Sequence, residues 1–136
     1  MLGMHDTVTV WNRFRNPETR KDEWYRRVID GCSWEQESVV DTSGAGAVIG
    51  NVYSVLIAAH EDYRAPPAWI DRDAHWTLQV GDIVAKGIVG VEITGTSPNR
   101  EADVLSVLSP AVFTVKAVLD ESEPHKQGRH YEVKGL

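Results

Sequence analysis

The chain has 136 residues, of which 42% are hydrophobic and 25% charged, a composition typical of a globular domain and not of a disordered chain. Twenty Asp and Glu against 14 Lys and Arg give a formal net charge of −6. This balance argues against a domain whose main task is to neutralise nucleic-acid phosphates. It is compatible with an acidic wall past which DNA slides without binding. We expect one domain over residues 1–136.

Cysteine content and hydropathy exclude further classes of protein. Cys32 is the only cysteine, so the chain has no intrachain disulfide and no Cys-rich zinc site. No apolar run approaches the ~18–20 residues of a membrane-spanning helix. The first residues lack the basic start and apolar core of a signal peptide. We therefore expect a protein that does not enter membranes and is intracellular where it is made.

Alternating residues predict three strands in the first part of the chain. Residues 7–14 predict the opening strand, followed by a polar loop over 15–22. Residues 24–29 and 32–37 predict the next two strands. Asp30-Gly31 between them is the strongest hairpin signal in the sequence.

Two long loops flank a nearly all-apolar strand predicted over residues 52–59. The first, residues 41–50, carries Gly44, Gly46 and Gly50. A phosphate-binding loop would lead into a helix, whereas strand-like residues follow here, so a hairpin loop is the better interpretation.

The second long loop covers residues 60–75 and is the best candidate for a partner contact. Pro66 and Pro67 stiffen it and prevent strand pairing. Tyr63 and Trp69 are large, rigid anchors, and Arg64 lies beside them. The expected contact set is therefore Tyr63, Arg64, Pro66, Pro67 and Trp69. The alternative that Trp69 only covers the end of a barrel stays open.

The second half of the chain predicts a central hairpin over residues 76–87, turning at Gly81-Asp82. A strand over 88–95 follows, and then a helix over about 98–109 with Ser97 as N-cap. The last strands are expected over 112–119 and 129–134. In all, the pattern predicts a mainly β fold, a small antiparallel barrel of about eight strands with one short helix.

The residues that could carry chemistry do not form a recognisable site. The five histidines are His5, His60, His75, His125 and His130, and none has the spacing of a ligand pair. His60-Glu61-Asp62 is a local cluster at the start of a loop, for which a solvated or capping role is expected. Cys32 falls on a core face, far in sequence from any histidine. We expect no catalytic residue, no cofactor site and no metal site.

Five stretches together resemble a known family. They are residues 30–34 (DGCSW), 76–87 (WTLQVGDIVAKG), 92–95 (EITG), 113–118 (FTVKAV) and 130–135 (HYEVKG). The chain resembles, over most of its length, the small structural proteins of tailed phages and prophages of Gram-positive bacteria, described as minor capsid or head–tail connector proteins. The Gly-rich and Pro-Pro loops are the unshared parts. These are scaffold motifs, so they identify a family better than a mechanism.

The resemblance implies a non-catalytic β-barrel subunit of a ring at the neck of a virion, assembled in the host cytoplasm. Its partners would be copies of itself and neighbouring portal, head-completion or tail proteins, with DNA passing nearby without sequence-specific binding. Two alternatives stay open. One is a barrel enzyme that binds a small molecule or metal through the histidines, and the other is a single-stranded nucleic-acid-binding barrel, in which Trp and Tyr stack bases.

Overall fold

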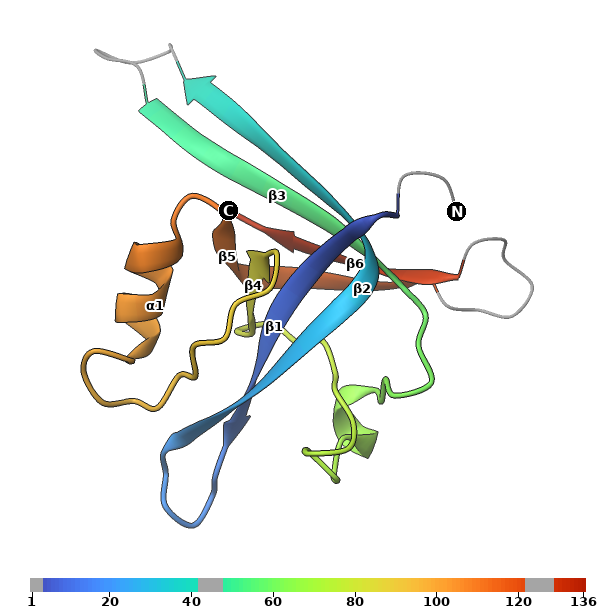
Figure 1. Cartoon of the computed structure of the whole chain (residues 1–136), viewed down its shortest axis with the longest axis vertical. Helices are drawn as coiled ribbons and strands as arrows, with labels where there is room; N and C mark the ends of the chain where they lie inside the picture. The colour runs from blue at the N-terminus through green and yellow to red at the C-terminus, as the bar shows by residue number, and fades with distance from the viewer. Residues whose placement is uncertain (1–3, 42–47, 122–128) are drawn as a thin grey trace.

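The chain forms a closed antiparallel barrel in the computed structural model, which describes residues 4–41, 48–121 and 129–136 (Figure 1). Six strands follow one another around the barrel of this described part in the order β1-β2-β3-β6-β5-β4. Their bounds are β1 Asp6–Arg15, β2 Asp22–Asp41, β3 Val48–Ala58, β4 Ile83–Lys86, β5 Val112–Glu121 and β6 His130–Gly135. The helix α1 (Glu101–Leu108) lies between β4 and β5, and a 3-10 turn covers Pro66–Ala68. The predicted mainly β fold, antiparallel barrel and single short helix are confirmed, whereas the count of about eight strands is wrong.

The Asp30-Gly31 hairpin is one reason for the difference, because β2 runs straight through it. Gly31 has φ +73°, and the register shifts from Asp6 opposite Cys32 to Val8 opposite Ile29. The glycine therefore forms a bulge within one long strand, and not the turn between two strands. The predicted strands 24–29 and 32–37 are parts of β2.

Two further predicted strands are irregular segments. Of residues 76–80, only Trp76 forms a bridge, a parallel one with Tyr63, so the expected hairpin around Gly81 has only its second strand, β4. The turn itself exists, with Gly81 at φ +97° and the Asp82 N–H donating to the Gln79 carbonyl at 3.1 Å. Residues 88–95 alternate because Val89, Val91 and Ile93 pack on the barrel, although they form no ladder.

The helix and the loops differ at their ends from the prediction. Helix α1 begins after Arg100 and not at Pro98, because the Asp103 carboxylate accepts the Arg100 N–H at 3.1 Å. Of the predicted loop 41–50, Asp41 belongs to β2 and residues 48–50 to β3, while residues 42–47 lie outside the described residues. The predicted loop 60–75 is irregular apart from the 3-10 turn. No helix in the described ranges has the length and apolar character needed to cross a bilayer.

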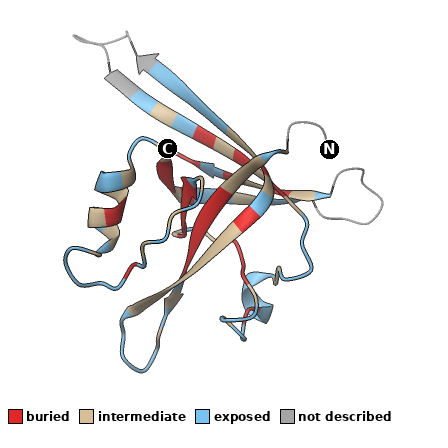
Figure 2. Ribbon diagram, in the orientation of Figure 1, coloured by how far each residue is buried: buried red, intermediate tan, exposed pale blue. Residues whose placement is uncertain are grey.

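The barrel interior is filled by apolar side chains from its strands and from the segment that precedes β4. Val8, Val55 and Val133 are fully buried there, and Trp76 and Leu78 of the irregular segment complete the cluster. Figure 2 shows these buried stretches in red along the middle of the strands. Side chains of the described residues therefore fill the centre of this fold.

The outer face of β1 and β4 is buried as well. Trp11, Ile83 and Val104 belong to a second apolar cluster beneath α1 and the segment 88–95. The Trp11 indole N–H donates to the Val91 carbonyl at 2.9 Å. The Thr9 hydroxyl donates to the Gly87 carbonyl at 2.8 Å and accepts the Val89 N–H at 2.9 Å. These bonds satisfy the irregular backbone that covers the barrel there.

Asp82 connects β1 to the irregular segment before β4. Its fully buried carboxylate accepts hydrogen bonds from Asn12 Nδ2 at 2.8 Å, the Arg13 N–H at 2.9 Å and the Gln79 N–H at 3.0 Å. Asn12 in turn donates to the Thr77 carbonyl at 2.7 Å. Side chains thus make the contacts that a strand ladder would have made between β1 and residues 77–82.

We predict that Asp82→Ala lowers the free energy of unfolding by about 3 kcal/mol, because it leaves several buried donors without an acceptor. Urea unfolding followed by tryptophan fluorescence measures the change. Asp73→Ala removes a carboxylate from an exposed loop position and should change stability by less than about 0.5 kcal/mol. Equal effects of the two substitutions would contradict the role assigned to Asp82.

We also predict a pH dependence that comes from Asp82. Burial raises its pKa to about 6 and outweighs the hydrogen bonds that favour the charged form. The unfolded value is about 3.9, so the folded state binds this proton more tightly. The Asp82 contribution to the free energy of unfolding therefore rises as pH falls through about 6 and is complete below about 4. Unfolding curves between about pH 7.5 and 4.5 should show this contribution in the wild type and not in Asp82→Asn; identical pH slopes would contradict it.

Candidate functional site

A groove of about 360 Å³ opens on the surface where β1 ends and the irregular segment 59–82 crosses it. Its β1 wall consists of Arg13, Phe14 and Arg15. The segment 59–82 contributes the other lining residues, Pro66, Pro67, Trp69, Ile70, Arg72, Gln79 and Val80. Three of these ten residues are arginines and none is acidic, which makes the groove basic in a chain of net charge −6.

Arg72 is held in place by aromatic rings. Its guanidinium carbon lies 3.5 Å from the centre of the Phe14 ring and 5.5 Å from that of Trp69. Such stacking favours a cation over an aromatic face. Its Nε atom is buried without a hydrogen-bond partner among the described residues. Arg72 therefore adds a positioned positive charge to the groove.

A second positive charge comes from Arg13, whose backbone is fixed by Asp82. The Arg13 N–H donates to Asp82, and its carbonyl accepts the Gln79 side-chain N–H. The guanidinium lies over Gly81, where an added Cβ would stand 2.7 Å from its Nη2. In the described part of the chain no carboxylate forms an ion pair with the Arg13 side chain, whereas Arg15 contacts Asp22 at 3.4 Å. Arg13 is thus available to an anionic partner.

The five loop residues expected to contact a partner divide into two groups. Pro66 and Pro67 are exposed and line the groove. Tyr63, by contrast, stacks on Tyr131 with ring centres 4.1 Å apart, and burial raises the pKa of its phenol to about 12. Arg64 donates to the Glu61 carbonyl at 2.7 Å. Tyr63 and Arg64 therefore fix the loop and do not line the groove.

Trp69 lines the groove, like the two prolines, but is buried. It is 5% exposed, its indole N–H donates to the His75 carbonyl at 2.9 Å, and its ring meets the Tyr25 ring edge-on at 5.7 Å. Trp69 therefore lines the groove and also ties the loop together through its bond to His75. This arrangement agrees with the alternative that Trp69 covers the end of the barrel.

Sequence reasoning missed the three arginines of the groove. Arg13 and Arg15 flank Phe14 at the end of a predicted strand, a pattern that indicates a basic, partly apolar strand end. Arg72 and Val80 join them only in the fold, more than 50 residues along the chain. A local sequence pattern cannot predict that residues so far apart in the chain line one groove.

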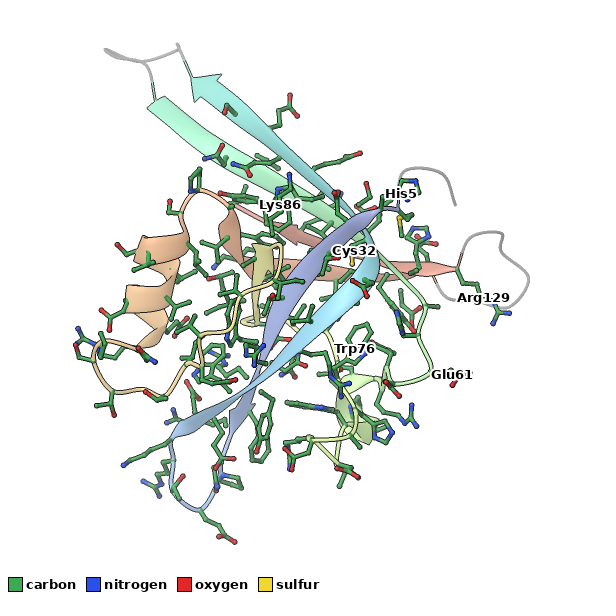
Figure 3. All side chains as sticks on the ribbon, viewed as in Figure 1. His5, Cys32, Glu61, Trp76, Lys86 and Arg129 are labelled. Carbon is green, nitrogen blue, oxygen red and sulfur yellow. The ribbon has the colours of Figure 1, made fainter. Side chains whose placement is uncertain are left out.

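Away from the groove, the titratable side chains of the described residues do not gather into a candidate metal site. No group of three His, Cys, Asp or Glu within residues 4–41, 48–121 and 129–136 could hold a metal ion; His125 lies outside the described residues. Burial, with Asp30 and Asp6 nearby, raises the pKa of the Cys32 thiol to about 12. Figure 3 shows Cys32 within the ribbon of the barrel and Glu61 at the outer edge of the loop segment.

The candidate site is therefore the groove. Its three arginines and its exposed apolar side chains best suit recognition of an acidic, partly apolar surface.

Comparison with known proteins assigns a family without a function. Residues 4–136 match the family described as "Family of unknown function (DUF6751)", and the chain belongs to this family. No curated protein and no solved structure shows significant similarity to the chain.

We predict that Trp69→Ala lowers the free energy of unfolding by about 3 kcal/mol, since a buried indole is lost and a cavity is left. Pro66→Ala and Pro67→Ala should each change it by less than about 0.5 kcal/mol, because both prolines are exposed. Thermal or urea unfolding measures all three. Trp69→Ala with unchanged stability would show that the indole is not part of the core.

Proposed function

We propose that this DUF6751 protein is a non-catalytic structural component of a phage or prophage head–tail connector. It would form part of an oligomeric ring at the neck of the virion. The resemblance in five stretches between residues 30 and 135 supports this assignment. The barrel fold that the resemblance implies is the fold of the chain.

The observation that carries the proposal is the distribution of side chains between inside and outside. Apolar residues such as Val8, Val55 and Val133 fill the barrel, and the basic groove lies on its surface. The longest strands, β2 and β3, extend beyond the barrel as a two-stranded ribbon (Figure 1). A packed interior with an extended ribbon and a surface groove suits a subunit that binds its neighbours.

The charge of the chain fits the same role. A net charge of −6 disfavours tight binding of the DNA backbone, and DNA must move through a neck without adhering to it. The partners in such a ring are further copies of the chain, with portal, head-completion or tail proteins above and below.

We predict that the protein is found in purified phage particles and that deletion of its gene leaves heads without attached tails. Induced particles from wild-type and deletion strains would be compared by negative-stain electron microscopy and by mass spectrometry. A plasmid copy of the gene should restore tailed particles. Normal tailed particles from the deletion strain, or absence of the protein from wild-type particles, would contradict the proposal.

A further inference from the structure

The outer part of the β2–β3 hairpin forms a protruding arm, which we define as residues 33–41 of β2 and 48–52 of β3. Strand β1 pairs with β2 no further than Cys32, and β6 pairs with β3 no earlier than Tyr53. Beyond these points the two strands pair only with each other in the described structure. Figure 2 shows the outer stretch of β2 as largely exposed. A two-stranded ribbon with open edges is marginally stable alone and readily pairs with another surface.

One face of the arm is both acidic and apolar. Glu37 lies opposite Val52 in the ladder, and Glu35 and Val39 follow at two-residue spacing on the same face. Both glutamates are exposed, and Val39 and Val52 are 46% and 39% exposed. Lys134 on the neighbouring strand β6 forms an ion pair with Glu132 of its own strand at 3.1 Å.

The groove has the complementary character. Arg13, Arg15 and Arg72 supply positive charge, and Ile70 and Val80 supply apolar surface at 74% and 62% exposure. The sequence shows the same separation of charge. Residues 13–27 contain six of the 14 Lys and Arg, whereas residues 28–63 contain six Asp or Glu and no Lys or Arg.

The arm and the groove lie at different ends of the molecule. The groove borders the end of β1, which pairs with the first residues of β2, whereas the arm contains the last residues of β2. In Figure 1 the β2–β3 hairpin points to the upper left and the β1–β2 hairpin to the lower left, so the two diverge from the barrel. An arm therefore cannot enter the groove of its own chain.

We propose that the arm of one copy docks into the groove of a second copy, with Glu35 and Glu37 facing Arg13 and Arg15. Val39 and Val52 would pack against Ile70 and Val80. Because the two surfaces differ, the contact is head-to-tail and generates a closed ring when its rotation closes. The inference rests on the proposed ring assembly and names the surfaces that form it.

Charge reversal on each surface tests the contact. The groove variant is Arg13→Glu/Arg15→Glu, and the arm variant is Glu35→Arg/Glu37→Arg. Each variant places like charges on the two surfaces that should meet, so self-association should weaken by about 100-fold. Sedimentation velocity at concentrations on the order of 100 μM measures the assembly state. Circular dichroism and thermal unfolding verify that each variant is folded.

Mixing the two variants gives the decisive result. In an equimolar mixture every arm meets a groove of opposite charge, so oligomers should reappear although neither variant assembles alone. Glu61→Arg changes an exposed charge away from both surfaces and should assemble like the wild type. Higher salt should weaken the wild-type assembly.

Other results would overturn the contact in distinguishable ways. Oligomers that persist in both variants would contradict the arm–groove contact and leave the proposed ring intact. A wild-type chain that stays monomeric would contradict the contact and self-assembly together. If a labelled single-stranded oligonucleotide binds the wild type and not the groove variant, while sedimentation is unchanged, the groove would belong to nucleic acid and not to the arm.

Discussion

The buried carboxylate of Asp82 is the interaction on which the rest of this structure depends. A charged group without water is unfavourable unless donors surround it, and Asn12, Arg13 and Gln79 supply them. These bonds attach an irregular segment to β1 where no strand ladder does so. They also fix the backbone of Arg13 and Gln79, two residues of the groove wall. The shape of the candidate site therefore follows from the chemistry of one core residue.

The packing of β1 extends the same principle. Its inner residues Val8 and Val10 fill the barrel, while Thr9 and Trp11 on its other face bond to the segment 87–91. A strand covered on both faces gives the barrel a rigid side next to the groove. The arm lies away from the groove, and among the described residues no third strand pairs with it. The chain thus combines one rigid, basic end with one extended, acidic end.

Much of the fold could be predicted from the sequence, because alternation and turn residues act locally. The strands β1, β3, β5 and β6, the helix and the barrel class follow from such patterns. The errors have physical causes. Asp30-Gly31 has the composition of a turn. However, β2 pairs with β1 on both sides of this dipeptide, so the glycine forms a bulge within the strand. Residues 88–95 alternate like a strand because they pack on Trp11 and Val104 from outside. The groove could not be predicted, since Arg13 and Arg72 come to line one surface only through the Asp82 network and the stacking of Arg72 on Phe14.

Cysteine cross-linking tests the head-to-tail contact most directly. Cys32 is buried, with a thiol pKa of about 12, so it does not compete with introduced thiols. A chain that carries both Val39→Cys and Val80→Cys should form, on mild oxidation, a ladder of covalent dimers, trimers and larger species. A mixture of the two single variants should give dimers only, and each single variant alone should give no cross-linked product. Homodimers from a single variant, or no ladder from the double variant, would contradict an arm that docks into the groove of the next subunit.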